Sequence, residues 1–211
     1  MTKQERILRD TKHMSLMLDM DKTFQAGHKV VVGIDEAGRG PLAGDVFAAA
    51  VILPADISLI GLKDSKKLSA KRRDELFLEI NNLALAIGIG RVSAAEIDEI
   101  NILNATFKAM QMALDNIKIN YDVILIDGNQ TIPNISCEQF AIVAGDNKSA
   151  AISAASIIAK VSRDRYMQTL NYHGFNFAKH KGYGTKEHYL EIDQLGITDI
   201  HRKSFLTKVL H

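Results

Sequence analysis

Short apolar runs alternate with longer amphipathic segments along this chain. The first two runs are residues 30–34, which end in acids and glycines, and residues 46–53, which end at Pro54. A glycine-rich segment joins them, so we predict two neighbouring strands in a hairpin. Three later runs predict further strands, at residues 86–92, 123–126 and 139–144.

Apolar residues recur at helical spacing between these strands. Residues 69–85 predict a helix that Ser69 caps, with basic residues on its outer face, and residues 102–117 predict a second helix. A third helix, rich in Ala and Ser, is expected to extend through Met167, with Asp146 or Asn147 as its cap.

The first 28 residues mix charges with apolar positions in the pattern of a short amphipathic helix. We expect this N-terminal extension to lie outside the main domain, which we take as residues 29–211, and either to dock on it or to fray. No internal repeat, low-complexity tract or linker follows residue 28. The apolar positions of the extension are Met14, Leu16, Met17, Leu18 and Met20.

Composition restricts the class of protein. The chain has 211 residues, of which 46% are hydrophobic and 24% charged, and these values exclude disordered and fibrous proteins. The single cysteine, Cys137, excludes an intrachain disulfide and a zinc site of several thiolates. The longest apolar run is too short to span a bilayer, and the charged first ten residues do not resemble a signal peptide. We therefore expect a cytoplasmic, monomeric protein with no membrane contact.

Charge is balanced over the whole chain but not along it. The formal net charge is +1, so an anionic partner must be attracted by local patches. Residues 63–73 hold six basic residues and one acid, and residues 160–211 hold nine Lys or Arg against five acids, a surplus of 9 − 5 = 4. Five of the seven histidines also lie in the second patch.

Four acids, Asp35, Glu36, Asp127 and Asp146, each follow an apolar segment. Taken singly, each has an ordinary explanation as a turn former or helix cap. If they converge on one edge of a sheet, however, they repel one another unless a cation neutralises them. Oxygen ligands without Cys or clustered His favour magnesium or manganese.

The segment GRGPLAG follows the first two acids. Gly38 and Gly40 allow the chain to bend and a nucleic-acid backbone to approach, and the Arg39 fork suits phosphate. The alternative is a dinucleotide-binding loop, but the glycine spacing and the following helix that such a loop needs are absent.

Two other segments are candidates for nucleic-acid contacts. Lys66 and Lys67 precede a predicted helix and can bind phosphate, although a solvated helix face is an equal interpretation. Tyr183 lies between two glycines among basic residues, where it serves either packing or as a platform for a sugar or base. The nearby histidines lack tight ligand spacing, so we expect them at the surface or on phosphate rather than on a metal.

Five motifs together resemble the ribonuclease HII family, the bacterial type 2 ribonucleases H, over about residues 28–205. The resemblance implies an α/β, ribonuclease H-like fold, a mixed five-stranded sheet flanked by helices, with a C-terminal helical portion that closes over the substrate. The sister ribonuclease HIII normally carries a larger N-terminal domain than 28 residues allow. The motifs are GIDEAGRGPLAGDVFAAAVIL, LKDSKKLS, ILIDGN, GDNKSAAISAASIIAKVSRDRY and HKGYGTKEH.

The resemblance also assigns roles. Asp35, Glu36, Asp127 and Asp146 resemble the four catalytic, metal-binding carboxylates. The other matching positions resemble substrate-binding residues: Gly38, Arg39 and Gly40 at the 2′-hydroxyl of the RNA-to-DNA junction, Tyr183 beside the junction sugar, and Lys66, Lys67 and Lys160 on phosphates.

The expected activity is endonucleolytic cleavage of the RNA strand of RNA–DNA hybrids, and cleavage on the 5′ side of single ribonucleotides in duplex DNA. It implies two Mg²⁺ or Mn²⁺ ions and gives 5′-phosphate and 3′-hydroxyl ends. Two alternatives stay open: a magnesium-dependent phosphatase or phosphoryl-transfer enzyme on a small substrate, and a non-catalytic hybrid-binding module. The sequence does not identify a protein partner.

Overall fold

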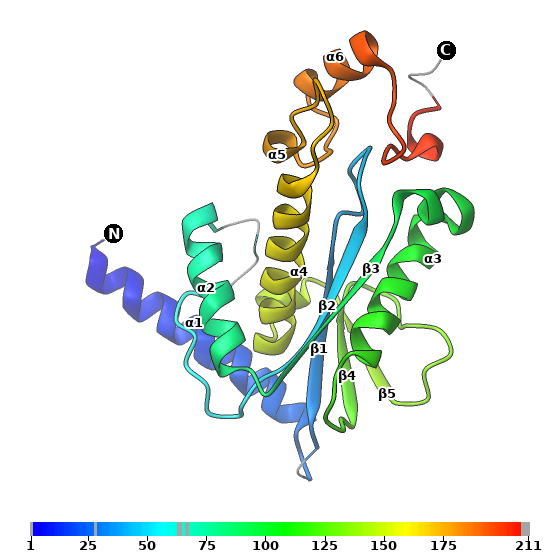
Figure 1. Cartoon of the computed structure of the whole chain (residues 1–211). Coiled ribbons are helices and arrows are strands. Elements are labelled where there is room, and N and C mark those ends of the chain that lie inside the picture. The colour runs from blue at the N-terminus through cyan, green and yellow to red at the C-terminus, as the bar shows by residue number, and fades with distance from the viewer. Residues whose placement is uncertain (1, 28, 63–64, 66–67, 208–211) are drawn as a thin grey trace.

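The computed structural model describes residues 2–27, 29–62, 65 and 68–207. It shows a five-stranded mixed sheet with helices on both faces, as the resemblance implied (Figure 1). The strands are β1 (Val31–Ala37), β2 (Val46–Ile52), β3 (Ala86–Val92), β4 (Val123–Asp127) and β5 (Glu138–Ile142). The helices are α1 (Lys3–Phe24), α2 (Ala70–Leu83), α3 (Ala94–Asp115), α4 (Ala150–Thr169), α5 (Phe177–His180) and α6 (Lys186–Leu195), with short 3-10 helices η2 (Gly145–Asn147) and η3 (Lys203–Phe205).

The sheet has the strand order β3-β2-β1-β4-β5. β1, β2 and β3 are antiparallel neighbours, which confirms the predicted hairpin, whereas β1, β4 and β5 run parallel. Because the carboxyl ends of parallel strands meet at one edge of a sheet, the acids that end β1 and β4 come to the same edge. Figure 1 shows β1 running toward the C-terminal helices α5 and α6 at this edge.

Two apolar layers hold the fold together. One lies between the sheet and the helices α1, α2 and α4, and the other lies between the sheet and α3. Every residue of the interior strand β2 is buried, as expected for a strand covered on both faces. Gly33 lets β1 approach α4 closely, because a Cβ there would lie 2.2 Å from the Ala151 backbone. This close packing fixes the height of β1 relative to the start of α4.

The predicted helices are present, with two differences. α3 starts at Ala94 rather than at residue 102, because the pattern is interrupted at Asn101, where φ is 65° and ψ is 165°. The Asn101 side chain accepts from the amides of Leu103 and Asn104 and so caps the second part of the helix. α4 is capped by Ser149, which accepts from Ile152, rather than by Asp146 or Asn147.

The N-terminal extension is a helix, as predicted, and of the two alternatives its second half is docked on the domain. Met14 and Met17 are buried in the layer beside α4. Asp21 accepts a hydrogen bond from the Ala151 amide at 3.0 Å. Amphipathic patterning alone did not distinguish a docked helix from a free one. Among the described residues, no helix combines the length and apolarity needed to cross a membrane.

Candidate active site

The end of β1 presents two adjacent carboxylates. Asp35 is 5% exposed and its Oδ1 accepts the Glu36 amide at 2.7 Å. β1 extends one residue further to Ala37, and Gly38 then turns the chain with φ at 99°. Successive side chains of a strand point to opposite faces, yet both acids line one cavity at this turn.

This first cavity has a volume of about 160 Å³ and joins four separate segments. The structure therefore brings together the β1 acids, the glycine-arginine-glycine loop, Lys160 and Tyr183, as the sequence predicted. The lining residues are Asp35, Glu36, Ala37, Gly38, Arg39, Gly40, Ser65, Ser156, Lys160 and Tyr183.

A second cavity, of about 220 Å³, adjoins the first because Glu36 and Arg39 line both. It contains Asp127, whose Oδ1 accepts the Gly145 amide at 2.7 Å. Asp146 follows Gly145 and is largely buried, but it is not among the residues that line either cavity. One hydrogen bond from a backbone amide thus links Asp127 to the segment that carries Asp146.

The electrostatics of this site favour a cation. Burial, and then the negative charges of Glu36 and Asp127, raise the pKa of Asp35 well above its usual range. A divalent ion would relieve both effects. The acids supply only oxygen donors, and the first cavity is lined by neither His nor Cys. Asp35, Glu36 and Asp127 therefore fit a hard divalent cation such as Mg²⁺ or Mn²⁺.

Cationic and aromatic groups border the acids. Arg39 forms a half-exposed ion pair with Glu36 at 3.4 Å. Lys160 Nζ lies 2.7 Å from the Asp164 carboxylate and 5.7 Å from the ring centroid of Tyr183. Tyr183 is 40% exposed, so its ring is accessible from the cavity. Lys160 is therefore close enough to the site to contact a phosphate, but its ammonium group also forms an ion pair with Asp164.

Two buried arginines that the sequence did not single out organise the loop after β1. Arg202 makes five hydrogen bonds of 2.6 to 3.0 Å, one for each of its N–H donors. Their acceptors are the carbonyl oxygens of Gly38, Arg39, Pro41 and Gly44.

The second arginine, Arg163 of α4, donates to the carbonyl oxygens of Ala43, Asp45 and Lys181. A Cβ at Gly38 would lie 2.1 Å from its Nε, so only glycine fits there. Burial lowers the pKa of Arg202 to about 9. Arginine is rarely buried, and both residues belong to the basic patch of residues 160–211, which the sequence predicted to be exposed.

The basic segment of residues 63–73 extends into the first turn of α2. Arg72 pairs with Glu75 and Glu79, and Arg73 donates to the carbonyl oxygens of Ser65 and Leu68. These two arginines therefore stabilise the local structure rather than form an open phosphate surface. Lys66 and Lys67 lie outside the described residues.

Three histidines of the C-terminal patch are buried, contrary to the expected surface positions. They are His180, His188 and His201, each 5% exposed or less. The prediction was wrong because it considered spacing in sequence, whereas the three rings meet only when α5, α6 and the following loop fold together.

Comparison with known proteins agrees with this geometry. The family model described as "Ribonuclease HII" matches residues 32–208. The ribonuclease HII of Acetivibrio thermocellus is 51% identical over 196 residues, which cover 92% of this chain and 76% of that protein. The ribonuclease HII of Vibrio cholerae is 54% identical over 182 residues, which cover 85% of this chain and 88% of that protein.

The fold is also found among solved structures. The crystal structure of the ribonuclease H2 from Pyrococcus horikoshii superimposes with a TM-score of 0.68 at 27% identity. The match covers 83% of this chain and 93% of that one. The two proteins therefore share the same overall fold over most of their length.

Proposed function

The chain belongs to the ribonuclease HII family of metal-dependent ribonucleases that act on RNA–DNA hybrids, and on this basis we propose that it also cuts on the 5′ side of single ribonucleotides in duplex DNA. The observation that carries the proposal is the first cavity. It joins two acids to the loop of Gly38, Arg39 and Gly40 and to the Tyr183 ring. Hydrolysis and recognition of one sugar can therefore occur at one place.

We propose that Asp35, Glu36, Asp127 and Asp146 hold two divalent ions, Mg²⁺ or Mn²⁺. Such ions, when bound, activate a water molecule and stabilise the leaving 3′ oxygen, which gives 5′-phosphate and 3′-hydroxyl ends. The buried position of Asp35 and the Gly145 bond to Asp127 fix the direction of these two side chains. No side-chain nucleophile is required.

Recognition is assigned to the other cavity residues. Arg202 holds the carbonyl oxygens of Gly38 and Arg39, so the backbone of this loop can meet a 2′-hydroxyl without rearrangement. The Tyr183 ring packs on the sugar at the RNA-to-DNA junction. Lys160, Lys66 and Lys67 contact phosphates, which contribute affinity but no sequence preference.

Labelled duplexes with zero, one or four consecutive ribonucleotides test this proposal, each incubated with Mg²⁺, Mn²⁺ or EDTA. We expect cleavage of the second and third duplexes with either metal, on the 5′ side of a ribonucleotide, and none in EDTA. A duplex whose single ribonucleotide carries a 2′-O-methyl group is the matched control, and it should resist cleavage. Cleavage of only the four-ribonucleotide duplex would contradict recognition of a single site.

The family assignment favours this function over the two alternatives. A phosphatase of small substrates would hydrolyse a phosphate monoester such as p-nitrophenyl phosphate under the same conditions. A non-catalytic module would bind the hybrid and leave it intact in both metals. We expect neither result.

A further inference from the structure

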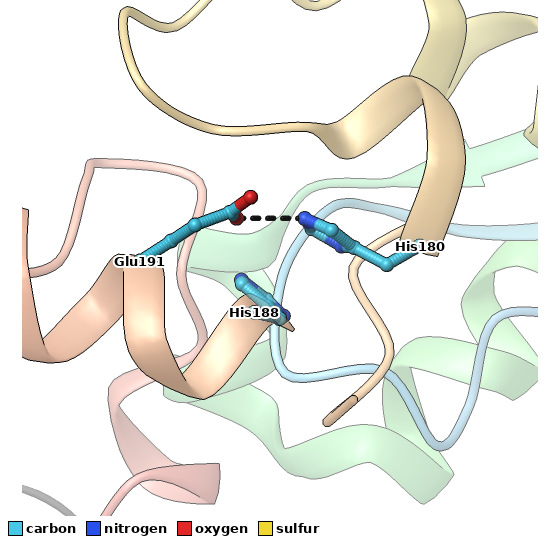
Figure 2. Close-up of side chains that lie close together, drawn as sticks. All are labelled: His180, His188 and Glu191. Carbon is cyan, nitrogen blue, oxygen red and sulfur yellow. Dashed lines mark hydrogen bonds and ion pairs between the residues drawn. The ribbon is translucent and has the colours of Figure 1, made fainter. Parts of the chain in front are cut away.

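Three buried histidines and a glutamate form a cluster next to the turn of residues 181–185, which carries Tyr183 and is named the Tyr183 turn. His180 ends α5, His188 and Glu191 belong to α6, and His201 comes from the loop that follows (Figure 2 shows the first three). Within the described part of the chain, His180, His188 and Glu191 are the group whose possible metal-ligating atoms all lie within 4.8 Å of one another. The proximity alone suggests either a metal site or a hydrogen-bond network.

The geometry of the rings favours hydrogen bonds. The rings of His180 and His188 are stacked with centroids 4.2 Å apart and planes 17° apart. A bound metal ion lies near the plane of each ligating imidazole, at about 2.0 to 2.1 Å from the nitrogen. Nearly parallel rings at this separation direct their lone pairs along separate planes, so they do not converge on one ion.

Every ring nitrogen of the cluster also has a partner. His180 Nδ1 accepts from the Gly182 amide at 3.1 Å, which leaves the proton on Nε2 to be donated to Glu191 at 2.8 Å. His201 Nδ1 accepts from the Thr198 amide at 2.9 Å, so its Nε2 carries the proton. The partners thus determine the tautomers of both neutral rings.

The His188 ring accepts one hydrogen bond and donates another. His201 Nε2 donates to His188 Nε2 at 3.0 Å, and His188 Nδ1 therefore donates to the carbonyl oxygen of Tyr183 at 3.0 Å. The same carbonyl accepts from the Thr185 amide at 2.8 Å. Burial lowers the pKa of His201 to about 4 and lowers that of His188, so both rings stay neutral near pH 7.

We propose that His188, oriented by His201, is a positioning residue that holds the Tyr183 turn for the substrate, and that the cluster acts through hydrogen bonds rather than through a bound metal ion. The role in substrate recognition rests on the function proposed above. The turn has little other freedom, because a Cβ at Gly182 would lie 2.3 Å from the Ala43 carbonyl oxygen. A bond to the Tyr183 carbonyl therefore sets the direction in which its ring leaves the backbone.

Two substitutions of His188 separate the two bonds that its ring makes. In His188→Asn the amide nitrogen replaces Nδ1, so donation to the Tyr183 carbonyl is retained and the bond to His201 is lost. In His188→Gln the longer side chain replaces Nε2, so the contact with His201 is retained and the bond to Tyr183 is lost. His173→Gln, at an exposed position of the same region, is the matched control.

The first readout is amide hydrogen exchange of residues 181–185 without substrate, which does not depend on the proposed function. We expect the Tyr183 and Thr185 amides to exchange about tenfold faster in His188→Gln, and within about threefold of wild type in His188→Asn. Equal exchange in the two variants would overturn the positioning role. Melting temperatures show that each variant is folded.

The second readout is cleavage of the single-ribonucleotide duplex. We expect KM to rise about tenfold in His188→Gln with kcat within about threefold, and both constants to stay within about threefold in His188→Asn. Equal losses in both variants, in proportion to the melting temperature, would instead show a structural role only. A wild-type protein that ignores this duplex would refute the proposed function, while the exchange result still decides the positioning of the turn.

Zinc retention tests the choice between hydrogen bonds and a metal. The wild-type protein, loaded with Zn²⁺ and dialysed, should retain no more zinc than His188→Asn by elemental analysis. Retention of one equivalent that His188→Asn abolishes would overturn the hydrogen-bond assignment.

Discussion

Arg202 Nη2 donates to the carbonyl oxygen of Gly38 at 2.6 Å, although 164 positions separate the two residues in the sequence. This bond ties the loop of the candidate active site to the C-terminal segment. The buried guanidinium has no acidic partner at hydrogen-bond distance among the described residues, and backbone carbonyls receive all five of its donors. Its replacement therefore changes the loop without removing any group from the cavity.

Substitution of Arg202 by Lys should destabilise the protein. An ammonium group offers at most three donors from one point, so at least two of the five hydrogen bonds are lost and at least one of the four loop carbonyls receives no donor from this side chain. We expect the free energy of unfolding to fall by about 2 to 4 kcal/mol, measured by urea denaturation. Arg165→Lys, at an exposed ion pair, is the control and should change stability by less than about 0.5 kcal/mol. Equal stability of the two variants would show that the loop does not depend on the guanidinium group of Arg202.

Asp127→Asn should preserve the fold and abolish most turnover. The asparagine oxygen can still accept the Gly145 amide, so the link to the Asp146 segment survives. One formal charge is lost from the candidate metal site, and affinity for divalent ions falls with it. Cleavage of a hybrid in saturating Mg²⁺ and duplex binding by fluorescence anisotropy measure the two effects.

We expect a rate loss of at least about a hundredfold with binding within about threefold, because the proposed phosphate contacts are assigned to other residues. Asp115→Asn, at the exposed end of α3, is the control. A variant that cleaves at the wild-type rate would show that Asp127 does not hold a catalytic metal ion.

Tyr183 can be altered in two steps. Tyr183→Phe keeps the ring and loses the hydroxyl, which should cost about 1 kcal/mol in kcat/KM, and Tyr183→Ala should cost a further 1 to 3 kcal/mol, roughly, through lost stacking. The loss should be greatest on a duplex with one ribonucleotide, which offers a single junction. Tyr189→Phe, at an exposed position of α6, is the control. Equal losses on all substrates with a lower melting temperature would identify Tyr183 as a packing residue.

Asp21 predicts a pH dependence of stability. Burial raises its pKa from 3.8 to about 6, so the folded protein binds this proton more tightly than the unfolded chain does. Ionised Asp21 therefore costs stability that grows as pH rises from about 4 to 6 and is constant above. The shift corresponds to about 3 kcal/mol, a net value that already includes the favourable hydrogen bonds from the start of α4.

Asp21→Asn keeps an oxygen for the Ala151 amide and has no charge to bury. It should be more stable than wild type by up to about 3 kcal/mol at pH 7, with the difference vanishing near pH 4. Urea denaturation across this range measures it. A difference that is constant with pH would show that folding does not shift the pKa of Asp21.

Local patterns were sufficient for much of the fold. Ser69 was predicted as the cap of α2 and accepts the Arg72 amide as expected. β3 has the predicted bounds because its flanking segments change pattern sharply. At Asn101, by contrast, a side chain caps the helix from within, and a strained backbone at a non-glycine residue has no sequence signature.

The site was predictable where one segment carries several of its residues. The acids and the glycine-arginine-glycine loop follow one another along β1, so their proximity requires no tertiary information. Arg202 and His188 could not be assigned in this way. Their partners lie on distant segments, and charged or imidazole groups are expected at the surface unless the fold supplies acceptors.

The five bonds of Arg202 also have a consequence for the order in which this protein matures during synthesis. The strands that carry Asp35 and Asp127 emerge from the ribosome well before Arg202, and until then the carbonyl oxygens of Gly38 and Arg39 lack their guanidinium partner. Hence a nascent chain can assemble its sheet and its acids while the substrate loop is still unsupported. Substrate recognition, which is proposed for this loop, is therefore expected to appear after the sheet has formed.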